Sequence, residues 1–204
     1  MITKLNIINS MLSAVGDDPV TSPDSQYPAA ITANAALDRI DVEMQSKGWW
    51  FNRDYGVTLS ATVAGEVIVP STALEVIPTT DIPVIQRGTR LYNNALHTFV
   101  IGEAVVVNMV SQLPIDQLPE VAKIYLMAKA IHRFYVDDDG DTEKMSQYLR
   151  EVNVAWLALQ QEHLKQLKLN AKLRPAAQAV LQGIRPSALW AGQRNPVYPG
   201  GTPQ

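Results

Sequence analysis

The sequence Lys47-Gly48-Trp49-Trp50-Phe51-Asn52 stands where the periodicity of the chain changes. Before it, apolar residues recur every three or four positions, as in amphipathic helices. After it they alternate, as in half-buried strands. Three consecutive aromatic residues cannot all face one side of a strand. We therefore expect Trp49, Trp50 and Phe51 to be core residues that form the joint between a helical half and a β half.

Two helices are predicted on the amino-terminal side of this joint. The first covers residues 2–15 and ends at Gly16. The second covers residues 30–47 and follows Pro28, which suits a helix start because its missing N–H costs nothing there. The expected core positions are Leu5, Ile8, Met11, Leu12 and Val15 in the first helix and Ala33, Leu37, Ile40 and Met44 in the second, whose alternative face carries Ile31, Ala35 and Val42.

Residues 52–111 are predicted to form a small antiparallel sandwich or barrel, because short alternating segments are separated by turn residues. Asn93-Asn94 and Gly102 supply turn signals, whereas Pro78 and Pro83 limit strand pairing. The expected strands cover residues 55–61, 66–69, 74–77, 84–92, 98–101 and 103–110.

The chain then returns to helices, with Pro119 as the first residue of a third helix and a fourth helix over residues 142–170. Their expected apolar faces are Val121, Ile124, Tyr125, Ala128, Ile131, His132 and Tyr135, and Met145, Leu149, Val152, Trp156 and Leu159. The sequence therefore predicts an α+β protein. Its expected parts are a four-helix bundle (1–51 and 112–170), an inserted β domain (52–111) and a Pro/Gly-rich carboxy-terminal docking arm (171–204).

The composition is that of an ordinary globular protein, with 204 residues, 47% hydrophobic and 18% charged. A net charge of −3 gives no overall attraction for nucleic acid, although a local basic patch stays open. The absence of cysteine excludes disulfides and thiolate metal sites and fits a reducing cytoplasm. The sequence shows neither a signal peptide nor an apolar run of about 20 residues, so we expect no membrane span.

The acidic run Asp137-Asp138-Asp139-Gly140-Asp141 is the most conspicuous candidate for a metal site. An EF-hand loop needs oxygen ligands at fixed positions and a bidentate acid at its end. With Gly140 as the central glycine, the first and last positions hold Tyr135 and Ser146, which excludes an EF-hand. We interpret the run as a turn between two helices, with Asp141 capping the second. No metal or cofactor is predicted.

A glycan hydrolase needs two carboxylates facing a cleft, about 5–10 Å apart. Nothing in the sequence pairs the available candidates, which are Glu103, Glu120, Asp137, Asp139 and Asp141. The histidines lack the i, i+4 spacing of a helical metal site: they are His97, His132 and His163. Neither a Gly-rich phosphate loop nor a nucleophile elbow occurs. No catalytic residue is therefore predicted.

The end of the chain combines basic residues with aromatic ones. Such a segment could meet DNA or an acidic protein surface, and interleaved aromatic anchors favour protein contact. The residues expected to contact a partner are Arg185, Trp190, Arg194 and Tyr198.

Five short blocks follow one another along the chain: MLSAVGDDPV (11–20), KGWWFN (47–52), GEVIVP (65–70), RGTRLY (87–92) and LPIDQLP (113–119). In order and spacing they resemble the tail tubular protein A family of short-tailed, autographivirus-type bacteriophages, as far as about residue 162. The family often has Phe where Ile115 stands and an acid where Asn93 stands, and both departures are conservative for packing. An alternative interpretation is a connector from another phage type, which would share only the helices and the arm. The aromatic joint and the block at residues 87–92 argue against it.

The resemblance implies a virion structural protein, namely the adaptor ring that joins the portal to the tail nozzle and forms part of the DNA ejection channel. It implies a dodecameric ring of this chain, with the portal protein, the nozzle protein (tail tubular protein B) and the tail fibre protein as partners. DNA would pass without sequence recognition, and no membrane would be involved. The protein would be made in the host cytoplasm and reside in the virion tail. The alternative is a tail-associated hydrolase of host surface glycan.

Overall fold

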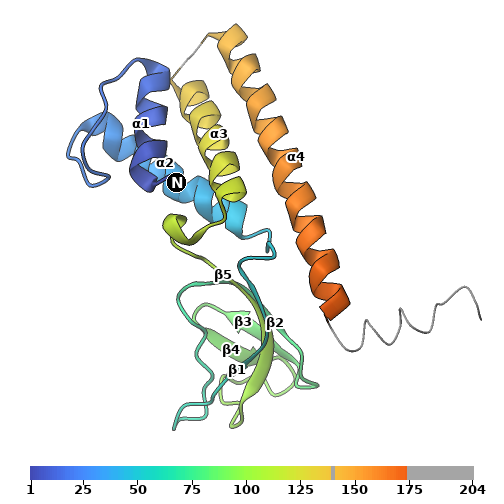
Figure 1. The fold of residues 1–204 in the computed structure, drawn as a ribbon. Coiled ribbons are helices and arrows are strands. Elements are labelled where there is room, and N and C mark those ends of the chain that lie inside the picture. Colours follow the sequence, from blue (N-terminus) through green and yellow to red (C-terminus); the bar gives the residue numbers. More distant parts are fainter. Residues whose placement is uncertain (139–140, 174–204) are drawn as a thin grey trace, which may run out of the picture. The chain divides into compact units, whose positions relative to one another are not determined.

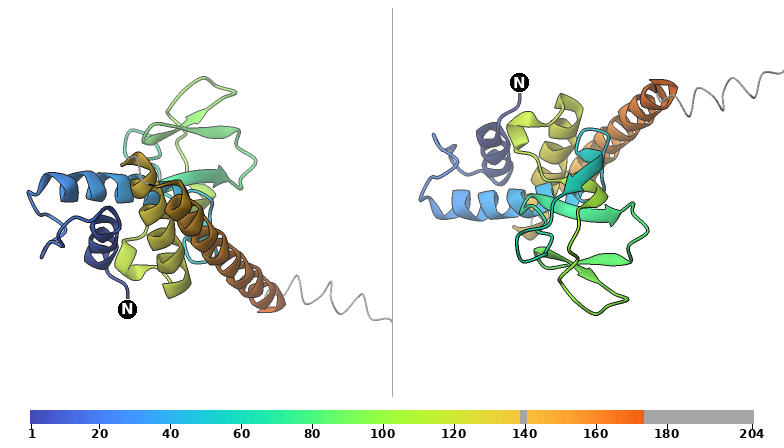
Figure 2. Two further views of the ribbon diagram at one scale, coloured as in Figure 1. Left: turned by 90° about the horizontal axis from the view of Figure 1, so that it is seen from above. Right: turned by 90° about the horizontal axis from the view of Figure 1, so that it is seen from below.

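The computed structural model describes residues 1–138 and 141–173, and the chain divides into two compact units, residues 1–163 and 164–204. The first unit contains a helical part and a β part (Figures 1 and 2). The helices are α1 (Lys4–Val15), α2 (Pro28–Gln45), η1 (Ile115–Gln117), α3 (Glu120–Asp137) and α4 (Thr142–Leu173). The strands are β1 (Arg53–Leu59), β2 (Ala73–Pro78), β3 (Val84–Arg87), β4 (Arg90–Asn93) and β5 (Val105–Ser111). The predicted α+β class is confirmed, and of the second unit only the end of α4 is described.

The helical core is built by α1, α2 and α3, which pack directly against one another. Thr3 starts α1 with a capping box that it shares with Asn6, and Gly16 ends the helix in the left-handed conformation that suits glycine. Pro28 occupies the first turn of α2, as predicted. The expected core face of α2 is also confirmed, because its four predicted positions are at most 3% exposed.

The predicted face of α3 is confirmed only in part. Tyr125 and Tyr135 are buried as predicted, whereas Ile124 is 44% exposed. The prediction missed a packed line formed by Ala122, Leu126, Ala130 and Phe134, each four residues after the last. Small alanines at two of these positions let neighbouring helices approach α3 closely. The prediction followed the largest side chains and was therefore displaced around the helix by about one position.

Large side chains, rather than close backbone approach, attach α4 to the rest of the helical part. It lies beside α3 on the side away from α1 (Figures 1 and 2). Ala155 and Leu159 are buried, and Tyr148 packs edge-on against Tyr135 with ring centres 5.2 Å apart. The predicted position Leu149 is wrong, since its side chain is 47% exposed and the contact line passes through Tyr148 instead.

Two antiparallel sheets form the β part, with strand orders β1-β5-β2 and β3-β4. β5 is the central strand of the larger sheet and is almost continuously apolar, as expected for a strand paired on both edges and covered on one face. A core of its own lies between the two sheets. Its buried residues are Leu59, Val67, Val69, Val84, Leu91, Val105, Val107 and Met109.

Three of the predicted strands need correction. Residues 84–92 form a hairpin rather than one strand, because Gly88 adopts a left-handed backbone conformation (φ 62°) and reverses the chain between β3 and β4. Residues 66–69 and 98–101 form only isolated bridges, among them Glu66 to Val100 and Ile68 to Arg90. Residues 66–69 and 98–101 are therefore short extended segments that pack at the β core without forming regular strands; we call them straps. The proposed division into a bundle, an inserted domain and an arm stays a prediction.

The corrected face of α3 is tested by comparing two substitutions on that helix. We expect Leu126→Ala to lower the free energy of unfolding by about 2–5 kcal/mol, because it leaves a cavity in the helical core. We expect Ile124→Ala to lower it by about 1 kcal/mol or less, because Ile124 is 44% exposed and lies outside the packed line. Urea unfolding followed by circular dichroism measures both. Equal losses would show that the structure has the wrong face of α3 in the core.

Candidate functional site

The end of α2 and the two ends of the β part meet at Asn52, which is 2% exposed. Its side-chain amide donates hydrogen bonds to the carbonyl oxygens of Gln45 and Ser111, both at 3.0 Å. Its Oδ1 accepts a hydrogen bond from the Trp49 N–H at 2.8 Å. Asn52 directly precedes β1, so one side chain ties the start of the β part to the last turn of α2 and to the last residue of β5.

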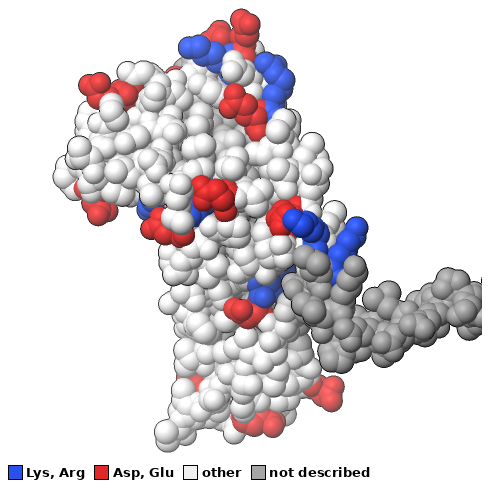
Figure 3. All heavy atoms as spheres, viewed as in Figure 1, with Lys and Arg blue, Asp and Glu red and all other residues white. Residues whose placement is uncertain are grey.

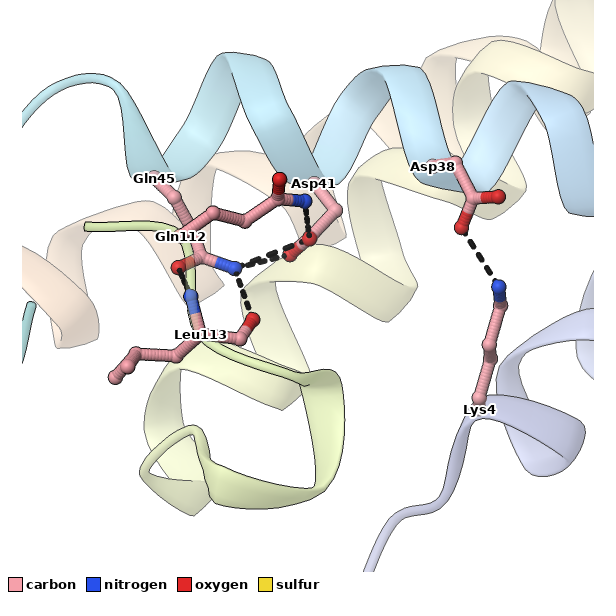
Figure 4. A network of polar contacts seen from close by, with 6 residues as sticks. All are labelled: Lys4, Asp38, Asp41, Gln45, Gln112 and Leu113. Carbon is pink, nitrogen blue, oxygen red and sulfur yellow. Dashed lines mark hydrogen bonds and ion pairs between the residues drawn. The ribbon is translucent and has the colours of Figure 1, made fainter. Parts of the chain in front are cut away.

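A second clamp fixes the chain where it leaves β5 (Figure 4). The Gln45 Oε1 accepts from the Leu113 N–H, and its Nε2 donates to the Leu113 carbonyl oxygen, both at 2.8 Å. These two bonds set the orientation of the amide. Its Nε2 consequently also faces Asp41, one turn earlier on α2, and the group at position 41 has to be an acceptor.

The Asp41 carboxylate accepts hydrogen bonds from Gln45 at 2.9 and 3.0 Å and from the Gln112 Nε2 at 3.1 Å. Its side chain is only 4% exposed. Burial raises the pKa of the Asp41 carboxyl, and the hydrogen bonds from the two glutamines offset part of that rise. Beside it, Lys4 pairs with Asp38 at 2.7 Å (Figure 4). The Gln45 and Asn52 amides bond backbone groups from distant segments, so the joint has a structural role.

Trp49 lies in the core, as predicted, whereas Trp50 and Phe51 are half-buried and pack against it; the aromatic segment links α4 to the joint. Trp49 is 4% exposed and donates its indole N–H to the Met44 carbonyl oxygen at 2.8 Å. Its ring packs edge-on against those of Trp156, at 5.4 Å, and His163, at 5.3 Å. The Trp50 N–H donates to the His163 Nδ1 at 3.3 Å. The helix that follows the acidic turn is therefore anchored by the segment that opens the β part.

Gly48 is required at this joint for two reasons. Its backbone is left-handed (φ 69°), which disfavours residues with a Cβ. A Cβ at this position would also meet the flexible end of the Arg53 side chain, which would have to move aside. The glycine of the KGWWFN block thus lets β1 start directly against the end of α2.

Lys123 is a buried charge that the sequence gave no reason to expect. It is 1% exposed, donates to the Asp116 carbonyl oxygen at 3.1 Å and lies 3.7 Å from a Glu120 carboxylate oxygen. Its role is to hold η1 against the first turn of α3. The one feature of the sequence that could have indicated its burial is that Lys123 stands between two apolar residues of the helix.

The acidic run has the structural role predicted for it. Asp137 ends α3 and pairs with Arg133 at 3.3 Å, and the Asp141 carboxylate caps α4 by accepting from the Lys144 N–H at 3.2 Å. Asp139 and Gly140 lie outside the described residues.

The other residues weighed for chemistry are not brought together. Glu120 accepts from the Ile2 N–H at 2.8 Å, and Glu103 is exposed at the far end of the β part. Burial lowers the pKa of both His132 and His163, and His97 lies on an exposed turn. Within residues 1–138 and the described part of α4, no cluster of three metal-binding side chains occurs, and no helix is long and apolar enough to cross a membrane.

Two exposed surfaces remain on the helical part. The first is an open groove of about 550 Å³ between the end of α1, the first half of α2 and the end of α3. Its walls are apolar and its rim is mostly acidic. The lining residues are Val15, Asp17, Ala29, Ile31, Thr32, Ala35, Ala36, Arg39, Phe134, Asp137 and Asp138.

The second surface is the outward face of α4. No charged residue occurs from 152 to 161, yet Val154 and Leu157 are 69% and 56% exposed. Figure 3 shows the corresponding stretch as white, between charged groups above and below it. Helix faces that are exposed to solvent usually carry charged residues, so the composition of this face is typical of a helix face packed against another protein surface.

The partner-contact residues expected from the sequence cannot be placed on either surface. Arg185, Trp190, Arg194 and Tyr198 lie outside the described residues. They stay predictions.

Comparison with known proteins identifies the family. A family model described as tail tubular protein matches residues 5–171 of the chain. The chain belongs to the tail tubular protein family. Tail tubular protein A of Klebsiella phage KP34 is 26% identical to it over 166 residues, which cover 79% of this chain and 87% of that protein. The resemblance found in the sequence is confirmed, and the chain is a structural component of a phage tail.

The tail tubular match takes in the Asn52 and Gln45 clamps, the groove and α4 as far as residue 171. It gives no support to a glycan hydrolase. The polar joint and the two exposed surfaces are therefore read as features of a protein that assembles, with the joint setting how the β part is presented.

The buried carboxyl at the joint makes stability depend on pH in a defined direction. Because the pKa of Asp41 is higher in the folded chain than in the unfolded one, folding favours its protonated form. Its contribution to stability is therefore greatest below pH 3.8 and is lost as the pH rises through the raised pKa. We expect the stability of the wild type relative to Asp41→Asn to fall over that window and then level off.

Urea unfolding of both proteins at a series of pH values measures this difference, in which the slopes of all other groups cancel. Asn at position 41 keeps an acceptor for Gln45, and the Gln112 amide can rotate to meet the new N–H₂ group, so the variant should fold. Parallel curves for the two proteins would contradict the assignment of a raised pKa to Asp41.

Proposed function

We propose that this chain forms the adaptor ring that joins the portal to the tail nozzle and surrounds part of the DNA ejection channel. The observation that carries the proposal is the match to a tail tubular protein A along most of both chains. The exposed groove and the uncharged face of α4 support it, because a subunit of a closed ring presents two different surfaces to its two neighbours.

The proposed partners are a portal protein, a nozzle protein (tail tubular protein B), a tail fibre protein and further copies of this chain, twelve in the complete ring. The helical and β parts give such a subunit two different ends, held at a fixed angle by the joint. DNA would pass through without sequence recognition. A net charge of −3 suits that role, because phosphate attraction by clustered Lys and Arg would slow DNA in a channel. The protein would be made in the host cytoplasm and end in the virion tail.

Native mass spectrometry of the protein, alone and mixed with the portal ring of the same phage, tests the adaptor role. We expect a closed multi-subunit ring that adds stoichiometrically to the portal ring, because matching surfaces on neighbouring subunits should close the assembly. A portal ring from an unrelated phage serves as the control. A chain that stays monomeric in both samples would remove the adaptor role.

The carboxy-terminal segment is proposed to make the portal contact. We expect deletion of residues 171–204, or joint substitution of Arg185, Trp190, Arg194 and Tyr198 by Ala, to weaken portal binding by tenfold or more, since aromatic and Arg anchors dominate interfaces. Biolayer interferometry against the immobilised portal measures this loss. Substitution of Gln182, Gln193 and Gln204 by Ala is the matched control within the segment. Unchanged binding by the deletion variant would show that the segment is not the portal contact.

A further inference from the structure

The outward face of α4 is an exposed surface without a partner in the first unit. Leu149, Val154 and Leu157 are 47%, 69% and 56% exposed, and Asn153 lies between them on the helix. Residues three and four apart share a helix face, which places Val154 and Asn153 one turn from Leu157, whereas Leu149 lies at the edge of this face. Arg150 belongs to the same face and, in the part of the chain that the structure describes, has no ion-pair partner. The face is thus apolar at its centre, and Arg150 stands at one end of it among Glu143, Lys144 and Glu151.

The groove at the end of α1 and α3 is the other exposed surface. Ile31, on its edge, is 49% exposed, and the apolar wall continues through Ala35 and Phe134. Three aspartates and one arginine stand among its lining residues, so the rim is net acidic. Asp138 has no ion-pair partner among the described side chains. A volume of about 550 Å³ admits several apolar side chains.

These two surfaces lie on different sides of the helical part. The groove is formed by α1, α2 and the end of α3, whereas α4 lies beyond α3 from α1 (Figures 1 and 2). The face of α4 therefore cannot fill the groove of its own subunit. It can fill the groove of another copy, and each copy then keeps one free face and one free groove for its next neighbours.

We propose that the uncharged face of α4 docks in the acidic-rimmed groove of a second copy of this chain, with Leu157 and Val154 against the apolar wall and Arg150 beside Asp138. The contact is head-to-tail, and its repetition closes a ring when the rotation between neighbouring copies divides a full turn. Apolar side chains exclude water at the centre, and opposite charges at the edge fix the direction of approach. This contact rests on the proposed ring and names the surfaces that build it.

Because the chain has no cysteine, introduced thiols test the contact directly. Two differently tagged copies, one with Ile31→Cys and one with Leu157→Cys, are co-expressed and oxidised, and cross-linked chains are separated on a non-reducing gel. We expect a disulfide between the two tags, and none when either variant is expressed alone. Ile124→Cys, with similar exposure on α3, replaces Ile31→Cys in the control pair and should not cross-link.

Native mass spectrometry of the same samples separates the failure of this contact from the failure of the adaptor role. A ring without the Ile31–Leu157 cross-link would overturn the contact and leave the adaptor role standing. A cross-link in either variant alone would also overturn it, because that pattern belongs to a two-fold dimer. A wild-type chain that forms no ring, with or without the portal, would overturn both.

Charge reversal gives an independent readout. We expect Arg150→Glu and Asp138→Lys each to weaken subunit association by about tenfold or more, because each places like charges opposite one another. The double variant should recover much of the loss. Both positions are exposed, so circular dichroism of each variant should match the wild type. A double variant as weak as the singles would contradict the pairing.

Discussion

The two hydrogen bonds between the Gln45 side-chain amide and the backbone of Leu113 are the constraint on which the rest of the structure depends. They join the last residue of α2 to the chain 68 positions later, where it leaves the β part. The β part starts at Asn52, which is bonded to the same turn of α2. The inserted strands are therefore held at both of their ends by one helix terminus, and a change at either clamp would free the β part to rotate.

This joint is polar, although it is buried. Polar groups removed from water cost free energy unless they are hydrogen-bonded, and the amides of Gln45 and Asn52 meet this condition through backbone partners. Asp41 is the third buried polar side chain of this network. Its burial makes ionisation of the carboxyl less favourable and so raises its pKa. A buried polar network of this kind favours one arrangement of the two parts, because any other angle would leave its donors and acceptors unpaired. A fixed angle is what an assembling subunit needs.

The helical part buries its inner faces and leaves an apolar outer face exposed. The inner faces of α1, α2 and α3 close a core, and Trp49, Tyr125 and Trp156 attach α4 through ring contacts. The outer face of α4 keeps apolar side chains that the first unit does not cover. A helix attached by a few large rings can present its opposite face without a second layer of helices, and this is the face used in the proposed contact between copies.

The sequence by itself determined the helix–β–helix order, the core role of the aromatic segment, the buried face of α2 and the capping role of Asp141. Each of these depends on local periodicity or on turn chemistry, which neighbouring residues specify. Tertiary structure alone decided the buried face of α3, the hairpin at Gly88, the straps over the β core and the Asp41–Gln45–Gln112 network. These features depend on which segments meet across long separations. Small alanines, a buried lysine and paired amides acquire their roles only from the partners that the folded chain brings to them.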